Sequence, residues 1–170
     1  MLAVPVKLSQ QANAIQEVLT KWANPRGGVV VVTQHLKQMW EVIYDECDAP
    51  RLIVCYGGEV DRGDWTNRVD RTWLVAVCRG SRGFLSCSCD GSPAKPKGDA
   101  EPFMDSLEEV RDLCRVMIGI SEENPLAYRS CKPIQTANVA TDAYLVEFST
   151  ANDISAVTPD NPSAEEPEET

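Results

Sequence analysis

The sequence is poor in the groups that carry out chemistry or cross a membrane. Of its 170 residues only His35 is a histidine, and aromatic residues make up 6%. The longest apolar runs, Leu52 to Tyr56 and Trp73 to Cys78, fall far short of the ~18 residues that span a bilayer. The start, Met1 to Val6, has no basic residue and is interrupted by Pro5, so we expect no signal peptide. These absences predict a soluble protein of the cytoplasm, or of a particle assembled there, with no membrane partner.

Motifs for catalysis are also missing. The chain contains no glycine-rich phosphate loop, no serine-hydrolase elbow and no zinc-protease motif. His35 lies beside an amphipathic pattern, which favours a capping or solvent-facing role over that of a general base. Adjacent carboxylates such as Glu108 and Glu109 point in different directions on a helix and indicate a solvated face. We therefore expect no enzyme activity, no catalytic residue and no cofactor.

The seven cysteines are an odd number and include no C-x-x-C pair. Cys78 and Cys114 sit in apolar runs, where a thiol behaves as a small hydrophobe. Cys87 and Cys89 would lie on one face of a strand, but only His35 is left among the histidines to complete a metal site with them. In a chain without an export signal we expect reduced thiols and no metal.

Charge is distributed unevenly along a chain whose net charge is −10. Residues 61–97 hold seven Lys and Arg against four Asp and Glu (+3), residues 98–150 hold four against ten (−6), and residues 151–170 hold none against six (−6). An acidic body argues against a protein that coats nucleic acid, because phosphate binding is driven by counterion release from a basic surface. The basic segment could face a polyanion or an acidic patch on a neighbouring subunit. The alternative is a solvated, arginine-rich loop.

Hydrophobic periodicity and turn residues predict one domain over residues 1–157 and a disordered acidic tail over residues 158–170. Helices are expected from Ser9 to about Trp22, over residues 35–46 and from Asp105, with Ser9 and Asp105 as N-caps. The segments with strand character are residues 29–33, 51–56 (ending at Gly57 and Gly58), 71–78, 84–89, 128–134 and 143–149. Residues 90–102, rich in Gly and Pro, are expected to form a mobile loop.

This mixture of helices with hairpin-like pairs of strands predicts the fold class. We expect α+β, as a single domain with a small, mostly antiparallel β-sheet and two main helices packed on one face.

The order of these segments is more informative than any single motif. A Tyr-Gly-Gly-Glu strand end at residues 56–59 is followed by a charged excursion and a Trp-bearing strand over residues 71–77, and an Asp-Ala-Tyr strand begins at Asp142. In this arrangement, over residues 9–150, the chain resembles the tail terminator (tail-completion, or minor tail) proteins of long-tailed bacteriophages. The resemblance offers no counterpart for residues 79–102.

The resemblance implies a structural protein of the virion tail, assembled in the host cytoplasm. Such proteins form a ring, commonly of six copies, which caps the finished tail tube, stops its polymerisation and presents a joining surface to the head. The implied partners are further copies of the chain, the tail tube protein and the head–tail connector, with DNA passing only transiently through the lumen.

A ring subunit needs surfaces that meet a neighbour or the lumen. The +3 segment of one copy could meet the −6 segment of the next in a head-to-tail contact that closes into a ring. The candidate interface or lumen residues are Glu59, Arg62, Trp65, Arg68, Arg71, Arg79 and Arg82.

Three other functions remain open at this stage. The nearest is another neck component of the same particle, such as a head-closure or connector protein. A second is a small enzyme that uses Cys47 or Cys87 together with His35. A third is a cytoplasmic adaptor whose acidic tail binds a basic partner.

Overall fold

The computed structural model describes residues 6–63, 68–86, 102–117, 126–135 and 142–153. In this part of the chain three α-helices and one short 3₁₀ helix accompany five β-strands. In chain order these are α1 (Leu8–Ala23), η1 (Asn24–Arg26), β1 (Val29–Thr33), α2 (Leu36–Tyr44), β2 (Arg51–Asp61), β3 (Arg68–Cys78), α3 (Phe103–Met117), β4 (Ala127–Pro133) and β5 (Ala143–Asp153).

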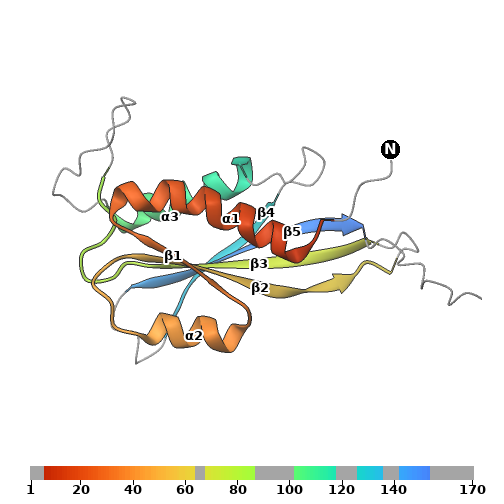
Figure 1. The fold of residues 1–170 in the computed structure, drawn as a ribbon, viewed down its shortest axis with the longest axis horizontal. Coiled ribbons are helices and arrows are strands. Elements are labelled where there is room, and N and C mark those ends of the chain that lie inside the picture. The colour runs from red at the N-terminus through yellow and green to blue at the C-terminus, as the bar shows by residue number, and fades with distance from the viewer. Residues whose placement is uncertain (1–5, 64–67, 87–101, 118–125, 136–141, 154–170) are drawn as a thin grey trace, which may run out of the picture.

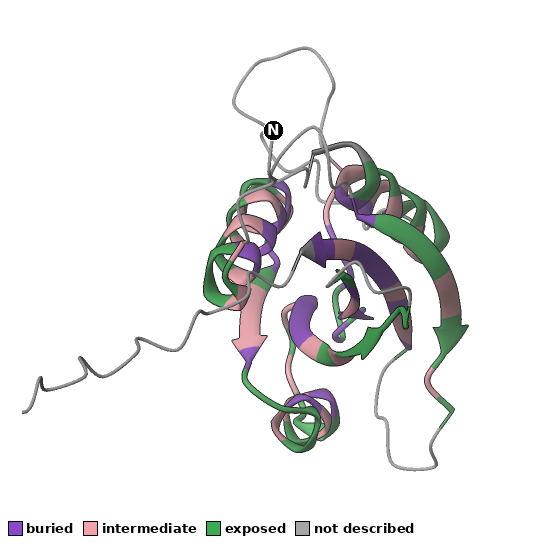
Figure 2. Ribbon diagram, turned by 90° about the vertical axis from the view of Figure 1, so that its right-hand side faces the viewer, coloured by how far each residue is buried: buried purple, intermediate pink, exposed green. Residues whose placement is uncertain are grey.

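The strands form a single sheet in the order β1-β2-β3-β5-β4. Only β1 and β2 are parallel; the other neighbours are antiparallel. The two long helices α1 and α3 cover one face of the sheet, and the short helix α2 lies on the other (Figures 1 and 2). The predicted α+β class, with a mostly antiparallel sheet and two main helices on one face, is therefore confirmed.

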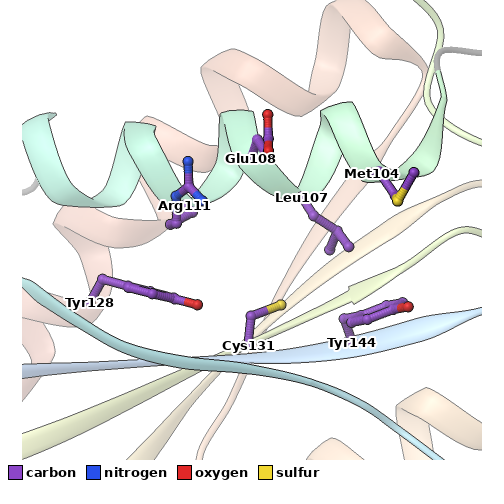
Figure 3. A pocket seen from close by; sticks show the side chains of 7 residues that line it. All are labelled: Met104, Leu107, Glu108, Arg111, Tyr128, Cys131 and Tyr144. Atoms are coloured by element: carbon purple, nitrogen blue, oxygen red, sulfur yellow. The ribbon is translucent and has the colours of Figure 1, made fainter.

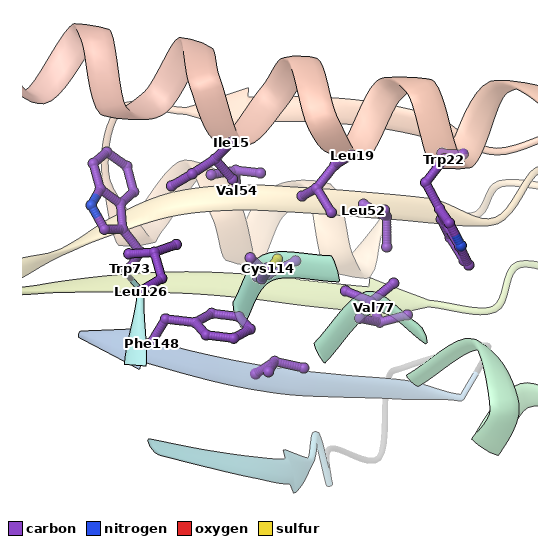
Figure 4. Close-up of a cluster of buried hydrophobic side chains, with 14 of the residues drawn as sticks. Ile15, Leu19, Trp22, Leu52, Val54, Trp73, Val77, Cys114, Leu126 and Phe148 are labelled. Atoms are coloured by element: carbon purple, nitrogen blue, oxygen red, sulfur yellow. The ribbon is translucent and has the colours of Figure 1, made fainter. Parts of the chain in front are cut away.

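The core is divided by the sheet into two clusters, because alternate strand residues point to opposite faces. Leu52 and Val54 of β2 face α1 and α3, whereas Ile53 and Cys55 face α2. The larger cluster also takes in the spaced apolar residues of α1 and α3 (Figure 4). Val110 and Cys114 of α3, one helical turn apart, are fully buried in it.

One carboxylate expected on a solvated face instead links the two long helices. Glu109 accepts hydrogen bonds from Trp22 Nε1 (2.8 Å) and from Arg26 Nη2 (3.1 Å). Glu108 is exposed as expected, whereas Glu109 is partly exposed and also has partners on α1 and η1 that the prediction did not include. The partners lie more than 80 residues away, so the local pattern could not reveal them.

Two helix starts differ from the prediction. α1 begins at Leu8, with Lys7 at the cap position; the Gln10 side chain accepts the Lys7 backbone N–H (3.0 Å). α3 begins at Phe103, because the Pro102 carbonyl accepts the Asp105 N–H at 3.0 Å. Neither Ser9 nor Asp105 is therefore an N-cap, and Asp105 lies in the first turn instead.

The most consequential difference concerns β2, which does not end at Gly57 and Gly58. It continues to Asp61, and a β-bulge at Gly57 keeps it paired with β3. A Cβ atom on Gly57 would lie 2.9 Å from a Thr72 side-chain carbon, so only glycine allows this close approach. The charged excursion is therefore largely the outer half of a long β2–β3 hairpin.

Several predicted features lie outside the described residues: Trp65, the thiols of Cys87 and Cys89, nearly all of the loop over residues 90–102, and the acidic tail. Of the expected strand over residues 84–89, the described part contains an isolated β-bridge at Leu85, whose N–H donates to the Arg26 carbonyl (3.0 Å). No helix in the described ranges combines the length and the hydrophobicity needed to cross a bilayer.

Candidate functional site

The structure separates the predicted interface residues into two groups. Glu59, Arg62, Arg68 and Arg71 lie together on the outer half of the β2–β3 hairpin, since Glu59 pairs with Arg71 across the strands and Arg68 begins β3. Arg79 and Arg82 follow the opposite end of β3, in a turn that packs against residues 48–49. The hairpin end is therefore one candidate site, and Arg79 and Arg82 belong to another surface.

An ion pair and a backbone hydrogen bond to a carboxylate define the surface of the hairpin end. Arg62 Nη2 lies 2.7 Å from Asp70 Oδ1, and both side chains are partly exposed. The Asp61 carboxylate accepts the Gly63 N–H (2.9 Å) and tightens the start of the turn. Val60, on the same stretch, is 70% exposed. Exposed pairs of this kind contribute little to stability, so their main effect is to fix an outward-facing surface of mixed charge.

Arg71 differs from the other hairpin arginines because it is engaged inside the subunit. Its side chain is 12% exposed and pairs with Glu59 (3.1 Å). Its Nη1 also donates to the Val6 carbonyl (2.6 Å) and to Gln11 Oε1 (3.4 Å). Arg71 therefore joins the hairpin to the segment that leads into α1, whereas Arg62 and Arg68 are exposed residues nearer the tip of the hairpin.

The hairpin is anchored by a buried polar network that the sequence analysis missed. Gln11, 2% exposed, accepts the indole N–H of Trp73 (3.1 Å) and donates to Asn152 Oδ1 (3.0 Å). One amide thus joins α1, β3 and β5. The spacing could have predicted that Gln11 is buried, because it precedes the buried Ile15 by four residues and so lies on the same helix face.

At the opposite end of β3, Arg79 and Arg82 lie in a turn fastened to the chain before β2. The Arg82 N–H donates to the Asp48 carbonyl (3.3 Å), and the Ser81 hydroxyl donates to Asp48 Oδ1 (2.8 Å). The Arg79 guanidinium lies 3.6 Å from the Asp142 carboxylate, with both side chains largely exposed. This surface carries both signs of charge and is well separated along β3 from the hairpin end.

His35 caps a helix, and two of the buried thiols lie in the core. His35 Nδ1 accepts the Gln38 N–H (3.2 Å) and caps α2, which is the role the sequence favours. Burial raises the pKa of the Cys78 thiol to about 11 and that of the Cys114 thiol to about 12. Among the residues the structure describes, no three His, Cys, Asp or Glu side chains cluster as metal ligands would.

We expect these two thiols to resist alkylation in the native protein. At pH 8 a thiol with a pKa near 11 is ionised about 100-fold less than one with a pKa near 9, and only the thiolate reacts. Iodoacetamide labelling read by peptide mass spectrometry should leave Cys78 and Cys114 unmodified until urea unfolds the chain. Cys47, which is partly exposed, serves as the internal control. Rapid labelling of Cys114 in the folded protein would contradict this packing.

A small hollow lies between α3 and the edge of the sheet formed by β4 and β5 (Figure 3). Its volume is about 230 Å³, and its walls are mainly apolar and aromatic. The Arg111 guanidinium lies 5.9 Å from the centre of the Tyr128 ring and donates to Asp112 (2.9 Å). Burial raises the pKa of the Cys131 thiol, an effect that nearby Arg111 partly offsets. The hollow can therefore accept an apolar side chain but presents no activated nucleophile.

The described residues thus offer two charged surfaces and one small, mainly apolar hollow. In comparisons with known proteins, no family model and no curated protein matches the chain. The hairpin end is the feature that combines exposure, charge and a rigid attachment to the body of the subunit.

Proposed function

We propose that this chain is a structural subunit of a bacteriophage tail. Copies of it form a ring, commonly of six, at the end of the finished tail tube. The ring stops polymerisation of the tube protein and presents the surface to which the head–tail connector joins. DNA passes through its lumen, and the subunit has no catalytic role.

The charged end of the β2–β3 hairpin carries this proposal. β1 pairs only with Arg51–Cys55 of β2, so the outer half of the hairpin extends past the end of β1. Arg71 and Gln11 fasten it to α1, while Arg62 and Arg68 lie on its exposed part. β5 stays paired with β3 as far as Arg68, so this charged surface lies at one end of the sheet. Such a surface suits a head-to-tail contact, in which one surface of a subunit meets a different surface of the next.

The mass of the full-length protein in solution tests the proposal. A six-membered ring of the 18.7 kDa chain has a mass of about 112 kDa, six times that of the subunit. Native mass spectrometry and electron microscopy, with the chain alone and with tubes of the tail tube protein, should show this ring free or on tube ends. Absence of a ring in both samples would refute the proposed function.

We predict that the double substitution Arg62→Glu and Arg68→Glu prevents ring formation. It reverses the charge of the hairpin end without touching Arg71, so the fold and the melting temperature should stay close to those of the wild type. The matched control is Lys21→Glu with Lys37→Glu, which makes the same change in net charge on exposed positions of α1 and α2. If both double variants form the ring equally well, the hairpin end does not take part in the contact between subunits.

The enzyme alternative has less support from the geometry. It requires a free imidazole beside a thiolate, but His35 Nδ1 is occupied in capping α2. Burial raises the pKa values of Cys78, Cys114 and Cys131, which makes these three thiols poor nucleophiles. Of the two thiols named for this alternative, Cys47 is partly exposed and Cys87 lies outside the described residues.

A further inference from the structure

The two edges of the sheet differ in their protection against pairing with another chain. β4, at one edge, contains Lys132 and Pro133 and is interrupted by a register shift at Arg129. Charge, proline and bulges are the devices by which proteins block edge strands. β1, at the other edge of the sheet (Figure 2), has none of them: Val29 to Thr33 is regular, β-branched and uncharged. Its pairing partner among the described strands is β2 alone.

Backbone geometry identifies which groups of β1 point away from the sheet. The Val29 N–H donates to the Pro50 carbonyl (3.0 Å), so the backbone of Val29 faces β2. Peptide groups alternate in direction along a strand, and Val31 and Thr33 therefore face β2 as well. The N–H and C=O groups of Val30 and Val32 point outward, which gives the edge two donors and two acceptors.

The surface beside this edge is uncharged as well. No charged residue occurs from Gly27 to Gln34, and Val29 is 48% exposed. On α1, Gln11 and Trp22 reach toward β3, β5 and α3. The helical repeat places Gln16 and Thr20 on the opposite flank, on the side of β1. Residues 27–34 and the flank of α1 formed by Gln16 and Thr20 therefore bring no charge that would repel the same residues of a second copy.

We propose that β1 is a self-pairing edge: two copies of the chain join β1 to β1 antiparallel, about a two-fold axis at Val31. In this register Val30 pairs with Val32 of the second copy and Val32 with its Val30, so all four outward groups on each strand are satisfied. A register centred on Val30 or Val32 leaves some of them unpaired. The pair also removes an open edge that would otherwise recruit other extended chains.

This contact is independent of the proposed ring. An isologous contact uses the same patch on both copies and closes at two, whereas a ring needs a head-to-tail contact between different patches. The pair weighs about 37 kDa, twice the 18.7 kDa of the chain. Because the strand is short, we expect a weak dimer that forms over the range of about 1 μM to 1 mM.

The test places charge on the proposed axis. The background is Arg62→Glu, Arg68→Glu, in which the charge of the hairpin end is reversed and we expect no ring. In this background Val31→Lys should weaken dimerisation by at least about 100-fold, because it places two like charges directly opposite each other. Val31→Glu should do the same. An equimolar mixture of the two should restore the dimer, as a mixed pair. Val31→Thr, which is β-branched and uncharged, should dimerise like the parent.

Hydrogen exchange supplies the second measurement, since the amides of Val30 and Val32 should be protected in the dimer and exposed in the Val31→Lys monomer. Three results would overturn the proposal: a monomer up to about 1 mM, no recovery on mixing the Lys and Glu variants, or protection of both amides in a monomer. The last would mean that another part of the same chain covers the edge. Unchanged thermal unfolding of the variants excludes misfolding as the cause. A ring that persists in Val31→Lys alone separates this contact from the proposed function.

Discussion

Replacing Gln11 with Leu is expected to lower the free energy of unfolding by about 3 kcal/mol, although the new side chain is apolar and similar in size. The change leaves the indole N–H of Trp73 and the Oδ1 atom of Asn152 without their partner in the core. Each buried polar group that loses its only partner costs about 1–3 kcal/mol. Arg71 keeps Glu59 and the Val6 carbonyl, so it adds little to the loss.

A double-mutant cycle distinguishes this cause from a general packing defect. Trp73→Phe removes the indole N–H, so combining it with Gln11→Leu should cost less than the sum of the two single losses, by about 1 kcal/mol. Urea unfolding of the four proteins measures the difference. Strict additivity would show that Gln11 and Trp73 do not share a hydrogen bond. Hydrogen exchange in β3 should also rise in Gln11→Leu, since the network anchors the hairpin.

Elements with a strong local pattern could be predicted from the sequence. The apolar spacing of Ile15, Leu19 and Trp22 predicts α1, and all three side chains are buried. The apolar runs of β2 and β3 likewise predict strands, and both form as expected. In these elements every residue agrees with the same local pattern, so the residues that pack against them from elsewhere in the chain do not have to be known.

The outer half of the β2–β3 hairpin could not be predicted, because the residues that allow β2 to continue lie on the neighbouring strand. Paired glycines ordinarily end a strand, and here Gly57 instead fits a bulge opposite Thr72. The same holds for the candidate site: Arg71 and Arg68 look alike in sequence, and only the position of Val6 and Gln11 makes one of them internal. Gln11 itself finds partners 62 and 141 residues away, which no local pattern encodes.

Among the glycines discussed, Gly80 should lose the most stability when it is replaced with alanine. Gly80 has a φ of 65°, and a Cβ atom there would lie 2.6 Å from the Ala49 carbonyl oxygen. Gly80→Ala therefore meets two costs, the left-handed conformation and a clash with backbone that cannot rotate away. We expect a loss of about 3 kcal/mol and a fall of about 10 °C in melting temperature.

Gly63→Ala is the matched control for this prediction. Its φ of 70° is nearly the same, but a Cβ atom there would have no other atom within 4 Å. It should lose only the conformational part, about 1 kcal/mol or about 3 °C. Equal losses in the two variants would mean that Gly80 does not approach Ala49 closely. Because Gly80 and Gly63 have nearly the same backbone angle, a larger loss of stability in Gly80→Ala would come from the clash with Ala49, which precedes β2.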